Sequence, residues 1–304
     1  MSKIDLNVNF AGIILENPIT TASGTFSSVD SSKFYDINQL GAVITKGISI
    51  NAWEGNPTPR IAETYGGMLN SVGLQNPGVD YYIENELEFL KKFKTKIIAN
   101  VVGRTIEEYC QVVEKLNETC VSMMEINISC PNIKKGGIGF GTDAKMAGEV
   151  TKAIKAISKK PVIIKLTPNV TDITEIAKAV EAEGADGVSL INTLLGMSID
   201  VNRKRPVLAN GMGGLSGPAI KPVALRMVYQ VSRAVKIPVI GLGGISSGED
   251  AVEFFMAGAK AVSIGTAALV NPIAPIKIKE ELLLYMRNNG FKNINEIKDA
   301  FCER

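Results

Sequence analysis

The hydrophobic pattern of the chain repeats in short units. Almost wholly apolar runs, each ended by polar or glycine residues, alternate with longer segments in which apolar residues recur at helical spacing. Such runs are typical of parallel strands buried on both faces. They lie at residues 19–22, 42–45, 97–101, 124–128, 162–166, 187–191, 239–242 and 261–264. Because these runs alternate with helical segments, the pattern predicts an α/β fold closed as a (β/α)8 TIM barrel.

The segments between the runs predict the barrel's helices. Helical spacing is found at residues 105–117, 143–158, 172–183, 218–235 and 249–257, and several of these segments open with a Thr, Asp or Ser suited to an N-cap. Residues 182–187 and 257–261 resemble each other, since each ends a helix with glycine and leads into a strand. Before the first run, residues 5–10 and 13–15 alternate around a turn, which predicts an N-terminal β-hairpin that caps one end of the barrel.

Two segments are too long for ordinary strand-to-helix connections. Residues 47–85 and 192–217 are rich in Gly, Asn and Pro. Long loops in a compact domain are more often functional than idle, so we expect both to lie over an active-site mouth. No linker or low-complexity boundary divides the sequence, which predicts a single domain over residues 1–304.

Charge and composition point to a small ligand. The chain has 33 basic and 31 acidic residues, a net charge of +2, so no strong field favours nucleic acid or a membrane surface. The first nine residues lack the long apolar core of a signal peptide or membrane anchor. We therefore expect a cytoplasmic protein with neither a nucleic-acid nor a membrane partner.

The absence of histidine limits the chemistry. With no histidine in the chain, Ser-His-Asp and Cys-His mechanisms and His-ligated metal sites are excluded. The four cysteines show no paired spacing, which argues against a zinc ribbon or a disulfide framework, and we expect no metal site. Proton transfer is left to Cys, Lys, Tyr, Asp or Glu.

Cys130 is the leading candidate for proton transfer. It follows the apolar run 124–128 and precedes Pro131, which cannot continue a central strand, so the thiol is expected where a strand gives way to a loop. In a barrel this is the catalytic end. Nearby cations would lower the pKa of a thiol toward neutral pH, and the residues alone leave open whether it acts as a nucleophile or as a base.

Glycines after the last two predicted strands indicate a phosphate site. They lie at Gly241, Gly243, Gly244 and Gly265, with Thr266 beside the last, and Gly217 precedes a predicted helix. Glycine lets backbone N–H groups approach an anion, and the loops after the last two strands are the usual phosphate position in this fold.

Polar residues end the other predicted strands. They are Lys46, Asn100, Asn127, Lys165, Asn192 and Thr193. Because all strand ends of a barrel face one mouth, two cations and several amides should converge there. Such a set suits a planar anion that needs both hydrogen-bond donors and acceptors.

Several motifs together give a resemblance to a known family. They are Gly55-Asn-Pro-Thr-Pro-Arg60, Gly67-Met-Leu-Asn-Ser-Val-Gly-Leu-Gln-Asn-Pro-Gly78, Asn127-Ile-Ser-Cys-Pro-Asn132, Lys165-Leu-Thr-Pro-Asn169, Ile191-Asn-Thr193 and Gly213-Gly-Leu-Ser-Gly-Pro218. Over nearly its whole length the chain resembles the class 1 dihydroorotate dehydrogenases. Within them it is most similar to the catalytic subunits of class 1B, on Gly73-Leu-Gln-Asn-Pro-Gly78 and Ile191-Asn-Thr193.

The resemblance implies an FMN-dependent oxidation of dihydroorotate to orotate in pyrimidine biosynthesis. By analogy, the FMN-binding residues are Ser23, Lys46, Gly47, Asn100, Asn127, Lys165, Ile191, Gly217, Gly243, Gly244, Gly265 and Thr266. The substrate-binding residues are Lys46, Asn70, Ser71, Val72, Gly73, Leu74, Asn127, Asn132, Asn192 and Thr193. Cys130 matches the class 1 base that removes the C5 proton as hydride passes from C6 to FMN, whereas class 2 members have serine there and carry an N-terminal membrane-associating extension.

Class 1B also implies a partner. In that class electrons pass to a second subunit carrying FAD and a 2Fe–2S cluster and from there to NAD, and a homodimer of catalytic subunits forms the core of a heterotetramer. The present chain lacks the clustered cysteines of such a centre, so any cluster is expected on the partner. Two alternatives stay open: a class 1A homodimer that reduces fumarate, and a phosphate-binding barrel aldolase or isomerase using Lys165 as a Schiff-base amine. A non-catalytic ligand-binding barrel would leave the thiol and both lysines without a role.

Overall fold

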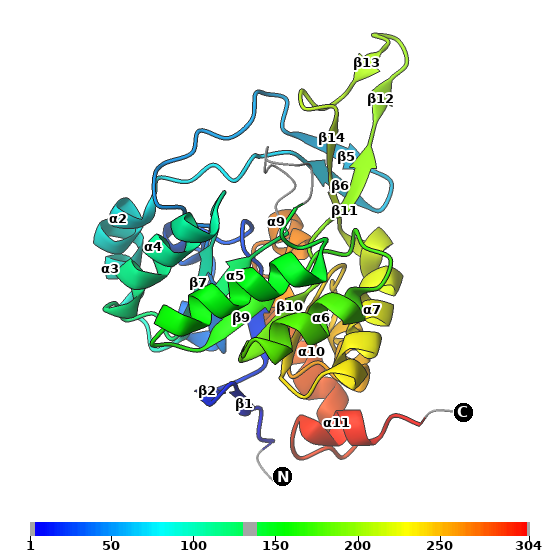
Figure 1. The fold of residues 1–304 in the computed structure, drawn as a ribbon. Coiled ribbons are helices and arrows are strands. Elements are labelled where there is room, and N and C mark those ends of the chain that lie inside the picture. Colours follow the sequence, from blue (N-terminus) through cyan, green and yellow to red (C-terminus); the bar gives the residue numbers. More distant parts are fainter. Residues whose placement is uncertain (1–3, 130–138, 303–304) are drawn as a thin grey trace.

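A closed barrel of parallel strands forms the centre of the molecule. The computed structural model describes residues 4–129 and 139–302. The barrel strands follow one another in chain order, and the last pairs with the first. They are β3 (Ile19–Thr21), β4 (Ala42–Ile44), β7 (Lys96–Val101), β8 (Met123–Asn127), β9 (Val162–Lys165), β10 (Gly187–Leu190), β15 (Val239–Leu242) and β16 (Ala261–Ile264). Every predicted strand and the barrel fold are confirmed (Figure 1).

Helices surround the barrel where the helical spacing predicted them. They are α4 (Ile106–Asn117), α5 (Ala144–Ile157), α6 (Ile173–Ala182), α7 (Lys221–Ala234) with the preceding turn η3 (Pro218–Ile220), and α8 (Gly248–Met256). Two further helices, α10 (Ala274–Asn288) and α11 (Asn295–Asp299), pack on α8 and were not predicted. Among the described helices, none has both the length and the apolar character needed to cross a bilayer.

Shorter elements connect the strands early in the chain and after the last barrel strand. They are α1 (Ser28–Ser31), η1 (Ile37–Gln39), the continuous helical stretch of α2 (Val79–Tyr81), η2 (Tyr82–Leu87) and α3 (Glu88–Leu90), and α9 (Thr266–Val270). The stretch from α2 to α3 follows β6 and leads into β7.

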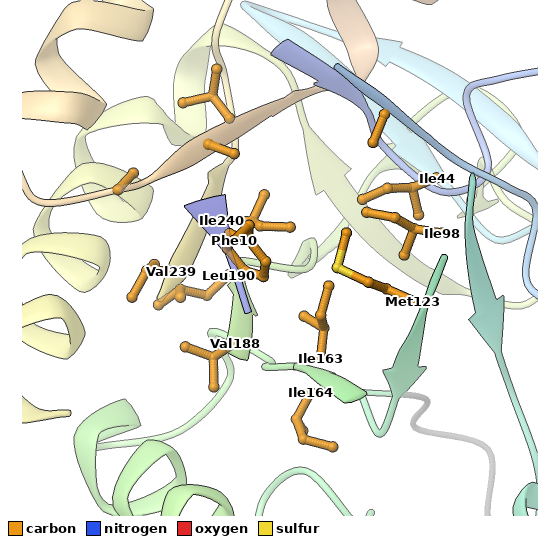
Figure 2. Packing of buried hydrophobic residues seen from close by; sticks show 14 of the residues in the cluster. Phe10, Ile44, Ile98, Met123, Ile163, Ile164, Val188, Leu190, Val239 and Ile240 are labelled. Atoms are coloured by element: carbon orange, nitrogen blue, oxygen red, sulfur yellow. The ribbon is translucent and has the colours of Figure 1, made fainter. Parts of the chain in front are cut away.

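The barrel interior is apolar toward its N-terminal end. Side chains such as Ile98, Met123, Ile163 and Ile240 come from strands around the ring and are fully buried (Figure 2). The hairpin of β1 (Val8–Phe10) and β2 (Ile13–Leu15) closes this end. The Phe10 ring lies so near the start of β10 that a Cβ at Gly187 would come within 2.8 Å of it. These contacts confirm the predicted hairpin cap.

The opposite end of the barrel carries a second sheet. Its strands are β5 (Ile61–Thr64), β6 (Gly67–Asn70), β11 (Leu194–Met197) and β14 (Met212–Ser216), in the antiparallel order β11-β14-β6-β5. Beyond it project β12 (Ile199–Asp200) and β13 (Arg205–Pro206) (Figure 1). The two long segments predicted as loops lie over the mouth as expected, but they contain strands and pair with each other through β6 and β14.

Candidate active site

A large cavity opens at the carboxyl ends of the barrel strands. Its volume is about 940 Å³, and it extends from the strand ends to the second sheet. All predicted cofactor and substrate residues within the described ranges line it: Ser23, Lys46, Gly47, Asn70, Ser71, Val72, Gly73, Leu74, Asn100, Asn127, Lys165, Ile191, Asn192, Thr193, Gly217, Gly243, Gly244, Gly265 and Thr266. The structure thus brings these residues together around one space.

Two predicted site residues, Cys130 and Asn132, lie outside the described residues. Ser129 and Gly139, which border that gap, both line the cavity. The Ser129 hydroxyl donates to the Lys165 carbonyl oxygen at 3.0 Å, and its N–H donates to Asn127 Oδ1 at 3.2 Å. The chain is therefore fixed to the cavity wall immediately before Cys130.

One end of the cavity is built from glycines with left-handed backbone angles. Gly217, Gly243 and Gly244 have φ of 108°, 126° and 76°. A Cβ at Gly244 would lie 2.8 Å from the Lys221 backbone nitrogen, and one at Gly243 would lie 2.7 Å from the Ala224 Cβ. Because both the angle and the space require glycine, the backbone itself forms this part of the surface.

The helix starts at the same end differ in whether a side chain caps them. Side chains of Thr105, Asp143, Asp172 and Ser247 cap α4, α5, α6 and α8. By contrast, η3 with α7 and the short α9 begin without a side-chain cap, and residues at both starts line the cavity. Thr266 and Ser216 join these two starts through hydroxyls 2.8 Å apart. At η3 the N–H groups of Ala219, Ile220 and Lys221 already donate to backbone carbonyl oxygens. The uncapped amides suited to a phosphate group are therefore those at the start of α9, beside the glycine surface.

Lys165 supplies a fixed cation in the middle of the site. It ends β9, its side chain is only 4% exposed, and its Nζ donates to Ser23 Oγ at 3.1 Å. The Nζ also lies 3.8 Å from Oε2 of Glu125, a carboxylate with no exposed surface. Contacts on two sides hold the ammonium group in place, as a buried charge requires.

Asn100 presents a free acceptor to the cavity. It lies on β7, fully buried, and its Nδ2 donates to Glu125 Oε2. Its Oδ1 has no hydrogen-bond partner among the described residues, and a Cβ at Gly47 would lie 3.0 Å from it. A buried acceptor without a partner is costly, so this atom is suited to a ligand donor.

Lys46 is the second cation of the site. It follows β4, and its Nζ lies 3.9 Å from the position that a Cβ at Gly24 would take. Burial, and then the nearby Arg60 cation, lower the pKa of Lys46 below its ordinary value. An anionic ligand beside it would offset both effects.

Two amide side chains, at the ends of β8 and β10, bond to each other at the mouth of the barrel. Asn127 Oδ1 accepts from Asn192 Nδ2 at 3.4 Å, and the Asn127 carbonyl oxygen accepts from the Tyr109 hydroxyl at 2.7 Å. Asn192 Oδ1 in turn accepts from the Thr193 N–H at 2.8 Å. These bonds give Asn127 and Asn192 defined orientations at the mouth.

The segment after β6 forms the opposite wall. The Asn56 Nδ2 donates to both the carbonyl oxygen and the hydroxyl of Ser71, at 3.1 and 2.9 Å. Gly73 has a φ of 75°, and a Cβ there would lie 2.6 Å from the Asn56 backbone nitrogen. The motif around Asn56 therefore shapes the wall that residues 70–74 present to the cavity.

Comparison with known proteins identifies the family. The family profile described as dihydroorotate dehydrogenase matches residues 5–286. The chain belongs to this family. It is 60% identical over 301 residues to the "Dihydroorotate dehydrogenase B (NAD(+)), catalytic subunit" of Alkaliphilus metalliredigens (strain QYMF), covering 99% of this chain and 100% of that protein. It is 58% identical over 298 residues to the protein of the same name in Alkaliphilus oremlandii (strain OhILAs), covering 98% and 99%.

A solved structure of a dihydroorotate dehydrogenase has the same fold. The enzyme of Eimeria tenella in complex with ferulenol superposes with a TM-score of 0.80 at 21% identity, covering 98% of this chain and 88% of that one. The names of the relatives agree with the class 1B resemblance seen in the sequence. They give no support to the fumarate-reducing or the aldolase alternative.

Sequence reasoning missed some residues of this site. Thr167 and Asn169 line the cavity, and Asn169 bonds the backbone of Thr193 and of Leu195. Their motif, Lys165-Leu-Thr-Pro-Asn169, supported the resemblance, and its position just after a barrel strand was the signal that would have found them. Glu125 was also missed, although a carboxylate within an otherwise apolar run is conspicuous.

Proposed function

We propose that this chain is the catalytic subunit of an NAD-linked dihydroorotate dehydrogenase, which oxidises (S)-dihydroorotate to orotate in the synthesis of UMP. The observation that carries the proposal is the identity of 60% and 58% to proteins of that name over nearly the whole chain. The converging lysines and amides agree with it, because orotate is a planar carboxylate with donor and acceptor edges.

The cavity fits FMN. Gly217, Gly243 and Gly244 with the uncapped start of α9 suit its phosphate. Asn100 Oδ1, which has no partner among the described residues, suits a donor on its ring system. We assign FMN binding to the predicted set around these atoms, including Ser23, Lys46, Gly47, Asn127, Lys165, Ile191, Gly265 and Thr266. The chemistry that FMN supplies when bound is acceptance of a hydride from C6 of the substrate.

Lys165 acts as a fixed electrostatic group. Its ammonium is held by Ser23 and Glu125 and has almost no access to solvent. A positive charge in so dry a place stabilises negative charge that develops beside it. The ion pair with Glu125 also suits a permanent cation better than the neutral amine that a Schiff-base mechanism needs.

The substrate is held at the other wall. We assign its binding to Lys46, residues 70–74, Asn127, Asn192 and Thr193, with Asn132 as a further contact predicted from the sequence. An anionic substrate next to Lys46 would offset the effects that lower the pKa of this lysine. The substrate carboxylate therefore has a favourable place beside Lys46.

Cys130 is proposed as the base that takes the C5 proton. Two observations support this role. The sequence has no histidine to act as the base, and Ser129 and Gly139, which flank residues 130–138, both line the cavity. Asn127 and Asn192 would hold the planar substrate while the thiolate accepts the proton. No covalent bond to sulfur is needed for this role.

The proposed electron path continues on another subunit. The relatives are named as catalytic subunits, so we propose a partner that carries FAD and a 2Fe–2S cluster and reduces NAD, assembled around a homodimer of this chain. The present sequence has four scattered cysteines, which do not provide the clustered ligands of such a centre.

One set of measurements tests the proposal. Purified protein should be yellow, release FMN on denaturation, and lose its flavin absorbance when mixed anaerobically with dihydroorotate. NAD reduction should require the co-purifying partner. A colourless protein that cannot be reconstituted with FMN would refute the proposal, and fumarate-coupled turnover without NAD activity in the presence of that partner would favour the class 1A alternative.

A further inference from the structure

A fully buried carboxylate lies behind the cavity wall. Glu125 is on β8, has 0% exposure, and does not itself line the cavity. It contacts side chains of three other barrel strands: Asn100 on β7, Lys165 on β9 and Ser189 on β10. A carboxylate in the barrel interior is costly to bury unless its partners compensate it, so its presence calls for an explanation.

The first consequence concerns the orientation of Asn100. An ionised carboxylate only accepts hydrogen bonds, so Asn100 must turn its Nδ2 toward Glu125 Oε2. The amide then presents Oδ1, the atom without a partner among the described residues, to the cavity. Glu125 thereby determines that the cavity receives an acceptor from Asn100 and not a donor.

The second consequence concerns charge. Glu125 Oε2 lies 3.8 Å from Lys165 Nζ, while Ser189 Oγ donates to Oε1 at 2.7 Å. The carboxylate offsets part of the positive field that Lys165 directs into the cavity. Because the surroundings have a low dielectric constant, this reduction of the positive field is felt by any group bound in the cavity.

We propose that Glu125 is a positioning residue that fixes the Asn100 amide and the Lys165 ammonium and thereby sets the reduction potential of the bound FMN. The inference rests on the proposed function, because it needs FMN in this cavity. A negative charge behind Lys165 disfavours the electron-rich reduced flavin, so removing that charge makes reduction easier.

The test uses the FMN-loaded protein and the midpoint potential of its flavin, measured spectroscopically against reference dyes. Glu125→Gln keeps the shape of the side chain and removes its charge. The expected result is a more positive potential, by at least about tenfold in the reduction equilibrium constant, or about 30 mV for a two-electron couple. An unchanged potential overturns the inference, even if the variant is less stable.

A matched control and a second variant complete the test. Asp186→Asn removes another carboxylate of an ion pair, 2.6 Å from Lys155 at the opposite end of the barrel, and should leave the potential unchanged. Ser189→Ala serves if Glu125→Gln does not fold. Ser189 does not line the cavity, and its hydroxyl donates to Glu125 Oε1, so loss of the hydroxyl changes the charge balance at that carboxylate. A shift of about twofold or more in the equilibrium constant, in either direction, then supports the inference, and no shift overturns it.

The two levels of proposal fail differently. Wild-type protein that cannot hold FMN refutes the proposed function. If wild-type protein holds FMN and Glu125→Gln has the wild-type potential, only the role of Glu125 is refuted. The same holds for Ser189→Ala where Glu125→Gln does not fold.

Discussion

Removing the buried cation at the centre of the site should cost much of the stability of the fold. Lys165→Met keeps most of the apolar side chain but leaves Glu125 as a buried carboxylate without its counter-ion. Their side chains are 4% and 0% exposed, so water cannot take over the role of the ammonium group. Breaking a buried pair from one side typically costs about 3–5 kcal/mol. Asn100 and Ser189 still donate to the carboxylate, which favours the lower end of that range.

The expected loss is large compared with the total free energy of unfolding. The free energy of unfolding of natural domains is about 5–15 kcal/mol, so Lys165→Met should remove a fifth or more of it. The double variant Glu125→Gln with Lys165→Met buries neither charge and should regain at least half of the loss. The measurement is urea unfolding followed by circular dichroism, with FMN removed so that cofactor affinity does not enter the midpoint.

A surface pair gives the control for this experiment. Lys159 pairs with Glu118, and their side chains are 68% and 74% exposed. Lys159→Met should therefore change stability by less than about 0.5 kcal/mol. The reasoning is refuted if Lys165→Met costs no more than this control, or if the double variant is as unstable as the single one.

Three further predictions concern the base, the cofactor end and pH. Cys130→Ser should retain FMN but slow its reduction by dihydroorotate by roughly two orders of magnitude at neutral pH, and unchanged single-turnover reduction would assign the proton to another group. Gly244→Ala should weaken FMN binding by about tenfold or more in a fluorescence titration. Gly211 also has a left-handed backbone, with φ of 78°, but has open space around it, so Gly211→Ala should leave FMN binding unchanged. Equal losses of FMN affinity in the two variants would contradict the argument from close packing at Gly244. Burial raises the pKa of Glu86 from 4.5 to about 7, so its ionisation destabilises the fold as pH rises through that range. Glu86→Gln should thus stabilise by up to about 3 kcal/mol at pH 8 and clearly less at pH 5, and an equal effect at both pH values in thermal unfolding would refute this.

The barrel was predictable because its strands are buried on both faces. Residues 162–164 and 239–242 are apolar without alternation, and the regular recurrence of such runs between helical segments indicates a parallel barrel. α10 was overlooked, although Ile278, Leu282 and Met286 recur at helical spacing and are all buried. It comes after the last barrel strand, where the alternation of strand and helix no longer indicates which element comes next.

The site was predictable wherever it depends on strand ends, because a closed barrel directs all of them to one mouth. Lys46, Asn100 and Lys165 illustrate this, since they are far apart in sequence and line one cavity. Glu125 could not be given a role in the same way. Its importance lies in contacts with three other strands, and such contacts are set by register and not by local pattern.

The pairing of β6 with β14 bears on how relatives of this protein can be recombined. β6 has β5 of its own segment on one side and β14, about 145 positions later, on the other. A chimera that exchanged only residues 47–85 with those of a distant relative would leave β14 facing a strand of foreign register. Successful exchanges should carry residues 192–217 as well, so we expect the two segments to act as one structural module despite their separation along the sequence.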